Sequence, residues 1–246
     1  MLDEKTWVIK IKKDVREAFD GIAESYDRLR AKPWNVLTSY LKKMRLDEIL
    51  EWGCCAADIG CGNGRNMLLL IEYVSRCVGV DISPKLIGIA RKNAKKRNYL
   101  KNMSFLIADA TMLPFRDGIF ELGLSIAVIH HIPSFEERRK AVCEISRTLT
   151  KKGIAIISVW RAFQPKFLKE LVKNLFRKIV GKCQELTDVL VPWRAGSSTY
   201  FRYYHLFTKR EFEKLLFSAN FTETCISKED GPHVKIRRNF FAFAVK

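Results

Sequence analysis

The sequence predicts an α/β fold in which helices cover both faces of a largely parallel sheet. Two observations predict it: short apolar runs alternate with amphipathic stretches between residues 54 and 160, and the connections between them are short. Hydrophobic residues make up 48% of the 246 residues, which is the composition of a globular protein. We expect a single domain over residues 1–246, with N-terminal helices within 1–50 and an insertion at about 161–207.

Seven strands are expected from short apolar runs, at residues 54–59, 76–81, 103–108, 119–126, 154–160, 222–227 and 238–245. The helices are expected from apolar residues at helical spacing and from capping residues such as Ser83, Ser134 and Thr208. They are expected at 14–28, from Pro33 onward, and at 65–73, 84–98, 134–149, 166–180 and 209–219.

A glycine-rich loop follows the first expected strand, with Gly60, Gly62 and Gly64 after Asp58. Glycines let the backbone turn sharply and approach a ligand closely. The start of the next helix offers free N–H groups that suit a carboxylate or a phosphate. The G-x-G-x-G spacing differs from the G-x-x-G ending of the dinucleotide fingerprint. Taken alone, such a loop is also compatible with a simple structural turn.

Further residues at strand ends indicate that the loop belongs to a ligand-binding site. Asp81 ends the second expected strand, Asp109 follows the third, and Ile126 ends the fourth, so all lie where open α/β sheets bind ligands. The pattern D-x-G-x-G-x-G with these residues resembles class I methyltransferases that use S-adenosylmethionine (SAM). The resemblance implies a Rossmann-like, mixed seven-stranded sheet with N-terminal lid helices, and SAM as the cofactor. It implies SAM contacts from Tyr26, Asp58, Gly60, Cys61, Gly62, Gly64, Asp81, Ile82, Asp109, Ala110 and Ile126.

The amino-acid composition limits the kinds of partner and the cellular environment that we expect for this protein. Lys and Arg total 44 against 27 acidic residues, a net charge of +17 that favours a polyanion such as nucleic acid. The seven cysteines are odd in number and form no C-x-x-C pair, so we expect neither a disulfide framework nor a bound metal. No apolar run approaches the roughly 20 residues that span a bilayer. We therefore expect a cytoplasmic protein without membrane contact.

Several segments outside the glycine loop resemble one family, the tRNA wobble-uridine carboxymethyl methyltransferases. They lie at residues 30–34, 125–131, 136–139, 158–160, 187–193 and 202–207. The last two are the specific ones, because generic class I enzymes lack them. The resemblance implies methyl transfer from SAM to the carboxylate of 5-carboxymethyluridine in a tRNA anticodon loop. The chain departs from the family in a shorter insertion between Trp160 and Thr187 and in having no fused oxygenase domain, so a related acid or another wobble modification stays open.

Ester formation on a carboxylate requires no general base, since this group is ionised at neutral pH. It requires groups that hold one oxygen while the other attacks. The candidates for acting on the acceptor are Arg30, His130, His131, Asp188 and Arg202, and their ranking stays open. Trp193, Tyr203, Tyr204 and His205 are candidates for binding an unpaired base by stacking. Each aromatic is alternatively part of a small apolar core beneath the insertion.

Two kinds of partner contact are expected. The basic stretch with Lys166, Lys169, Lys173, Arg177, Lys178 and Lys182, and the pair Arg237 and Arg238, are candidates for phosphate contacts or for solvated faces. The resemblance also implies a small zinc-containing activator protein, paired through the exposed edge strand at 103–108. A small-molecule methyltransferase is the main alternative function, and a non-catalytic SAM-binding RNA scaffold is the second.

Overall fold

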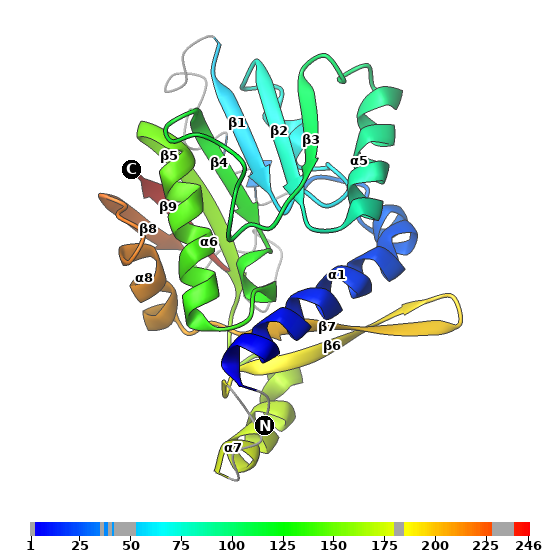
Figure 1. Ribbon diagram of the computed structural model, residues 1–246, viewed down its shortest axis with the longest axis vertical. Coiled ribbons are helices and arrows are strands. Elements are labelled where there is room, and N and C mark those ends of the chain that lie inside the picture. The colour runs from blue at the N-terminus through cyan, green and yellow to red at the C-terminus, as the bar shows by residue number, and fades with distance from the viewer. Residues whose placement is uncertain (1–2, 35–36, 39–40, 42–52, 180–184, 228–238) are drawn as a thin grey trace.

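A computed structural model describes residues 3–34, 37–38, 41, 53–179, 185–227 and 239–246. A seven-stranded sheet lies at its centre in the order β3-β2-β1-β4-β5-β9-β8 (Figure 1). The strands are β1 Cys55–Ile59, β2 Arg76–Asp81, β3 Met103–Ile107, β4 Phe120–Ile126, β5 Leu149–Trp160, β8 Glu223–Ser227 and β9 Asn239–Val245. The first five are parallel, while β9 is antiparallel to both β5 and β8. The expected mixed sheet of seven strands is confirmed.

Helices surround this sheet and begin where the capping residues predict. The side chain of Ser83 accepts a hydrogen bond from Leu86 N and opens α5 (Pro84–Lys96). Ser134 caps α6 (Phe135–Thr148) and Thr208 caps α8 (Lys209–Phe217) in the same manner. The remaining helices are α1 (Glu4–Leu29), the short α4 (Met67–Leu70) and α7 (Leu168–Ile179), which follows a 3-10 turn at Pro165–Phe167.

Two apolar clusters form the main core. Alternate residues of the parallel strands point to opposite faces of the sheet, so Ala56 joins one cluster and Ala57 joins the other. The first cluster contains side chains from α4 and α5, including Leu70 and Ile87. The second contains side chains from α6 and α8, including Phe212. Both faces of the central strands are therefore dry, as their almost continuous apolar sequences predict.

Three elements and the insertion differ from the sequence-based expectation. Helix α1 begins at Glu4, ten residues before the expected position, because Asp3 accepts a hydrogen bond from Thr6 N and caps it. Helix α4 covers only four residues, with turns on either side of it. Strand β5 begins at Leu149, five residues early, with an irregular register opposite β4. The helix expected after Pro33 falls largely outside the described residues, although Leu37 and Leu41 are fully buried.

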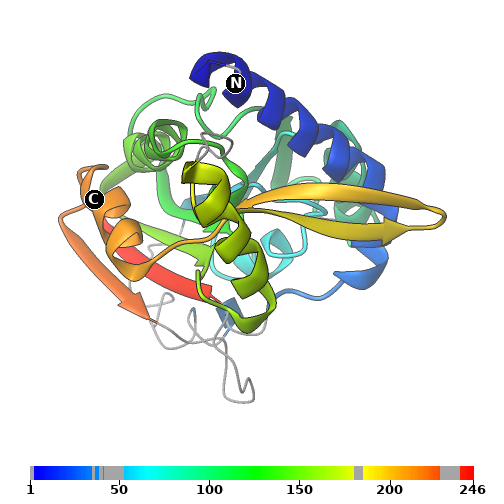
Figure 2. The ribbon, with the colours of Figure 1, turned by 90° about the horizontal axis from the view of Figure 1, so that it is seen from below.

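The fourth difference is a long β-hairpin in place of an irregular insertion. Strands β6 (Asp188–Ala195) and β7 (Ser198–His205) pair in antiparallel register, and Gly196 between them has a positive φ of 60°. The hairpin extends sideways beneath the sheet and runs alongside α1, with α7 lying across its base (Figures 1 and 2). Helix α1 and the hairpin thus come together next to the carboxyl ends of the parallel strands.

Candidate active site

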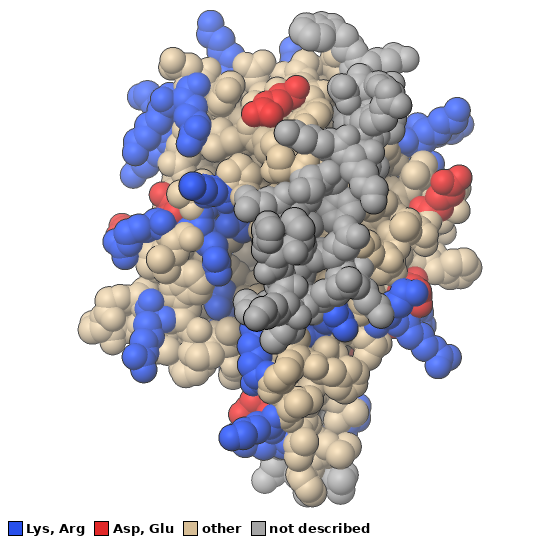
Figure 3. All heavy atoms as spheres, turned by 180° about the vertical axis from the view of Figure 1, so that it is seen from behind, with Lys and Arg blue, Asp and Glu red and all other residues tan. Residues whose placement is uncertain are grey.

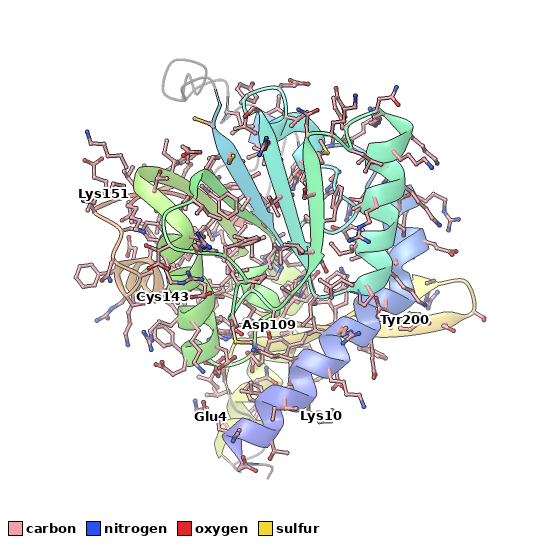
Figure 4. All side chains as sticks on the ribbon, turned by 45° about the horizontal axis from the view of Figure 1, so that its top comes forward. Glu4, Lys10, Asp109, Cys143, Lys151 and Tyr200 are labelled. Atoms are coloured by element: carbon pink, nitrogen blue, oxygen red, sulfur yellow. The ribbon has the colours of Figure 1, made fainter. Side chains whose placement is uncertain are left out.

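A cavity of about 1120 Å³ opens at the carboxyl ends of the parallel strands. Helix α1, the strand ends and the hairpin all contribute to its walls. Asp109, which lines the cavity, lies beside α1 in Figure 4. Most of the predicted site residues line it, namely Tyr26, Arg30, Gly60, Gly62, Asp81, Ile82, Asp109, Ala110, Ile126, His130, His131, Trp193, Arg202 and Tyr204. Six predicted residues do not line it, namely Asp58, Cys61, Gly64, Asp188, Tyr203 and His205.

The glycine loop forms one wall through backbone conformations that only glycine adopts easily. Gly60 and Gly62 have φ angles of 79° and 56°. A Cβ atom at Gly60 would lie 2.2 Å from a methyl group of Val128, whereas one at Gly62 would lie 3.6 Å from the ring of Tyr26. The loop therefore needs Gly60 both for its backbone angle and for close packing, and Gly62 mainly for its angle.

Two carboxyl groups lie beside this loop in different environments. Asp81 accepts hydrogen bonds from Gly62 N at 2.9 Å and from Ser83 N at 2.9 Å. Burial raises its pKa to about 6, although these two N–H groups lower it. Asp58 is 1% exposed and lies beneath the loop, where burial and then the charge of Asp81 raise its pKa to about 7. Among the described residues neither Asp58 oxygen has a hydrogen-bond partner.

Asp109 is held by a lysine that sequence reasoning missed. Lys12 of α1 lies 2.9 Å from the Asp109 carboxylate and also pairs with Glu137 at 2.5 Å. Burial raises the pKa of Asp109, but hydrogen bonds from Thr111 and Lys12 more than offset this and lower it. Lys12 shares one helical face with Val15, which also lines the cavity, so the spacing along α1 could have identified it.

The opposite wall brings an arginine between aromatic rings. The Arg202 guanidinium carbon lies 4.7 Å from the ring centroid of Trp193 and 5.3 Å from that of Tyr204. The Trp193 indole N–H donates to Ser25 Oγ of α1 at 2.9 Å, which ties the hairpin to the helix. Tyr200 packs on α1 where Gly21 leaves room for its ring (Figure 4). Arg202 is only 8% exposed, and burial lowers its pKa.

Two adjacent histidines line the cavity but differ in their bonding. His130 is fully buried beside Tyr204, and neither ring nitrogen has a partner among the described residues. Burial, followed by the charges around it, holds its pKa well below 6.5, so its ring is neutral. His131 Nδ1 lies 2.8 Å from the carbonyl oxygen of Tyr203, so this nitrogen must be the donor. Burial lowers the pKa of His131 to about 3, which leaves Nε2 as an acceptor only.

Asp188, Tyr203 and His205 lie behind the cavity in a buried charge cluster. Asp188 accepts a hydrogen bond from the Tyr203 hydroxyl at 2.8 Å and lies 2.9 Å from His205 Nδ1. His205 Nε2 lies 2.7 Å from Glu211, and Arg138 pairs with Glu185 at 2.8 Å. The cluster joins the hairpin to α6 and α8.

The charge state of His205 also bears on metal binding. Burial lowers its pKa, but hydrogen bonds to Asp188, Glu185 and Glu211 overcome this and raise it to about 10. Glu185, Asp188 and His205 are close enough to hold a metal ion. A protonated imidazole offers no lone pair to a metal, and Arg138 already adds positive charge. In the structure these groups form an ion cluster with Arg138 and Glu211.

Trp160 is a further cavity residue that the sequence analysis did not select. It ends β5, lines the cavity and packs against Tyr204, with ring centroids 4.7 Å apart. The rule that ligands lie beyond strand carboxyl ends would have identified it, had it been applied to the fifth strand. No helix in the described ranges is long and apolar enough to cross a membrane.

Comparisons with known proteins agree with this architecture. A profile described as "Methyltransferase domain" matches residues 57–157. The SAM-dependent methyltransferase structure from Methanosarcina mazei aligns with a TM-score of 0.66 at 21% identity, over 87% of this chain and 98% of that one. The Haloferax volcanii complex of the Trm112 methyltransferase activator with a methyltransferase aligns at 0.62 and 17% identity, over 94% and 96%. These likenesses show the class I methyltransferase fold.

Relatives of known name are more specific. The Schizosaccharomyces pombe tRNA (carboxymethyluridine(34)-5-O)-methyltransferase is 31% identical, over 83% of this chain and 87% of its own length. The protein of the same name from Arabidopsis thaliana is 33% identical over 62% of this chain, and the Xenopus tropicalis protein is 29% identical over 82%. The chain spans only about a third of these last two proteins, 34% and 36% of their lengths.

The geometry of the glycine loop predicts that two alanine substitutions lower the free energy of unfolding by different amounts. Gly62→Ala should lower the free energy of unfolding by about 1–2 kcal/mol, the cost of a left-handed backbone for a residue with a Cβ. Gly60→Ala should cost about 1–3 kcal/mol more, because its Cβ meets Val128. Urea denaturation measures both values. Equal losses for the two variants would contradict the packing around Gly60.

The ion cluster predicts a pH-dependent stability. Because the folded-state pKa of His205 is raised from 6.5 to about 10, its stabilisation is complete below pH 6.5 and is lost as the pH rises through 10. His205→Gln should cost roughly 3 kcal/mol at pH 7 and much less at pH 10. The control is His131→Gln, since His131 is neutral at both values. If urea denaturation gave His205→Gln the same deficit at both pH values, His205 would not be charged in the folded protein.

Proposed function

The chain belongs to the tRNA (carboxymethyluridine(34)-5-O)-methyltransferase family, and we propose that it transfers a methyl group from SAM to the carboxylate of 5-carboxymethyluridine at the wobble position of tRNA. The observation that carries the proposal is one cavity with two unlike walls. The glycine loop and Asp81 form one wall, and the buried cation Arg202 forms the other. The first suits an adenosyl group and the second suits an anionic acceptor.

The loop wall fits SAM. Gly60 and Gly62 bring bare backbone against the cavity, and Asp81 has spare lone pairs that can accept ribose hydroxyl groups. Asp109 and Ile82 line the adjoining surface and would contact the adenine end. When bound, SAM supplies an electrophilic methyl group on a sulfonium. Asp58, beneath the loop, supports the site without lining it, and Cys61 and Gly64 act only through the loop's shape.

The acceptor wall fits a carboxylate. Arg202 carries a positive charge in a place that little water reaches, where attraction for an anion is strong. Neutral His130 has an N–H to give and no partner for it among the residues described. His131 is less suitable, because its free nitrogen can only accept. We therefore assign the orientation of the acceptor to Arg202 and His130, and we assign Arg30 to the mouth of the cavity, where it is exposed.

In this reaction the protein mainly has to position the reacting atoms. The acceptor carboxylate is ionised at neutral pH, so no group has to remove a proton from it. Holding the attacking oxygen in line with the methyl carbon contributes several kcal/mol to the lowering of the barrier. Arg202 and His130 fix one oxygen, and Trp193 and Tyr204 restrict the arginine by stacking on it. These two rings, with Trp160, also form the surface on which an unpaired base would rest.

An RNA substrate is favoured over a small metabolite. Arg28, Arg30 and Lys32 line the cavity mouth and are exposed. Lys and Arg also outnumber Asp and Glu on the face shown in Figure 3. Such a surface would attract the phosphates around an anticodon loop, which presents unpaired bases without duplex melting. The named relatives are tRNA methyltransferases, which supports the same choice. Cytoplasmic tRNA would supply this substrate.

The edge of the sheet supports an activator partner. Strand β3 pairs with β2 alone among the described strands, and its Leu106 and Ile107 are 38% and 54% exposed. An apolar edge strand invites pairing with another chain. The Haloferax volcanii methyltransferase, which shares this fold, is complexed with the Trm112 activator. We propose that a small zinc-containing protein of this kind pairs with β3.

The test of the reaction is methyl transfer from labelled SAM to two matched tRNAs, one with 5-carboxymethyluridine at the wobble position and one with uridine. Transfer is expected only to the first. Arg202→Gln should lower kcat/KM about 10–100-fold, the worth of a charged hydrogen bond, while calorimetry shows unchanged SAM binding. His130→Gln should be more damaging than His131→Gln. Equal transfer to both tRNAs would disprove the carboxylate acceptor, and transfer to neither would disprove the tRNA function.

The edge proposal predicts that the activator raises the activity and solubility of this chain. Replacing Ile107, the more exposed of the two apolar residues, by Lys should weaken co-purification with the activator and lower activity in its presence. Ile119→Lys is a control, because Ile119 is similarly exposed, at 38%, but lies outside the strands. A monodisperse, fully active chain without any partner would disprove the proposal.

A further inference from the structure

Helix α5 and the turn after it carry a dense and purely positive surface. Between Asp81 and Asp109 the sequence contains no acidic residue but seven cations: Lys85, Arg91, Lys92, Lys95, Lys96, Arg97 and Lys101. All seven are exposed. In the view from behind, Lys and Arg gather on the side of the molecule where α5 lies (Figure 3). This surface is separate from the basic residues at the cavity mouth.

Helix α5 contains no ion pair among the described residues, whereas α1, α6, α7 and α8 each contain at least one. Some exposed lysines of the other helices pair within their own helix, as Lys10 does with Asp14 in α1 and Lys209 with Glu213 in α8. Ion pairs of this kind also occur in α6 and α7. None of the seven cations of α5 and its following turn forms an ion pair with any described residue. Their charge is therefore available to an external anion.

Helix stability does not explain this arrangement. Lys95 and Lys96 lie in the last turn, where cations favour the helix dipole. Lys85 lies in the first turn, where a cation is unfavourable. Lys85, Lys92 and Lys96 are seven and four residues apart, so they form one ridge about 17 Å long. The ridge lies opposite the buried face of α5, which contains Leu86 and Ala90.

The ridge starts at the cavity. Leu86 lines the cavity, and Ser83 at the helix start donates to Asp20 of α1 at 2.5 Å. From there α5 runs back along the β3 side of the sheet (Figure 1). The ridge therefore begins beside the cofactor wall of the cavity, which Asp81 and Ile82 also form. The backbone of an RNA that extends across the cavity from the acceptor wall would meet this end of α5 at Lys85. The stem next to an anticodon loop would continue past Lys92 and Lys96.

We propose that the Lys85–Lys92–Lys96 ridge of α5 binds the phosphate backbone of the tRNA stem adjoining the modified loop. The inference rests on the proposed tRNA function and adds a second contact surface to it. RNA fits better than an anionic membrane. A helix that binds membranes exposes an apolar face beside its cations, whereas the apolar face of α5 is buried against the sheet.

The experiment compares two triple variants of the full chain, with its activator where one is required. The first is Lys85→Gln, Lys92→Gln and Lys96→Gln. The matched control is Lys151→Gln, Lys152→Gln and Arg210→Gln, which removes three exposed charges away from α5. Binding of tRNA is measured by fluorescence anisotropy between 50 and 300 mM salt, and steady-state methylation is measured in parallel.

The α5 variant should bind tRNA roughly 10–100-fold more weakly. The slope of the logarithm of its binding constant against the logarithm of the salt concentration should become less steep by about 2–3, because each lost phosphate contact removes about 0.7–0.9 from this slope. Its KM for tRNA should rise while kcat is retained, because the ridge does not touch the reacting atoms. The control should change each value much less. Two results would overturn the inference. One is an equal loss of tRNA binding in the two variants. The other is that the wild type binds anionic vesicles and the α5 substitutions abolish this binding while tRNA binding persists. A wild type that methylates no tRNA would instead overturn the proposed function.

Discussion

The buried charges around His205 are the constraint on which the acceptor half of the site depends. The hairpin is long and extends sideways, so packing at its base must fix the direction in which it points. There, His205 and Asp188 of the hairpin join Glu185 of the preceding loop, Glu211 of α8 and Arg138 of α6. Burying charged side chains costs free energy, and a protein tolerates them only when they pair with one another in a fixed geometry. The cluster therefore specifies an orientation, and Trp193 and Arg202 reach the cavity as a result.

The two halves of the cavity follow from different physical rules. The cofactor half comes from parallel topology, since strands that run in one direction bring their following loops to a single edge. Gly60 and Asp81 meet there although they lie in different βα units. The acceptor half has no such general rule behind it. It is assembled from α1 and the hairpin, held together by contacts such as Trp193 to Ser25 and Tyr200 against Gly21.

This difference explains what the sequence could predict. The strands of the central sheet, the glycine loop and the helices capped by Ser83, Ser134 and Thr208 are local patterns. They were found with boundaries close to the observed ones, except that β5 begins five residues early. The hairpin was missed because its strands lack polar alternation: Tyr203 and Tyr204 are both buried, one facing Asp188 and the other Trp160. Asp188 was expected to act on the acceptor and His205 to stack on a base, because both residue types suit a substrate pocket as well as they suit ion pairs. Only the folded structure distinguishes the two, because it brings Arg138 of α6 and Glu211 of α8 to this cluster.

The positively charged residues of the protein fall into two groups, exposed and buried, which interact with anions in different ways. A cation near solvent attracts a polyanion from a distance but discriminates little, because water and salt screen it. The ridge on α5 and the mouth around Arg30 have this character. Arg202 is nearly dry and confined by aromatic rings, so it interacts strongly with a single anionic group at a fixed position. In the proposed reaction, affinity for any tRNA would therefore reside on the surface, while the choice of a base that carries a carboxylate would reside in one buried guanidinium beside a neutral imidazole.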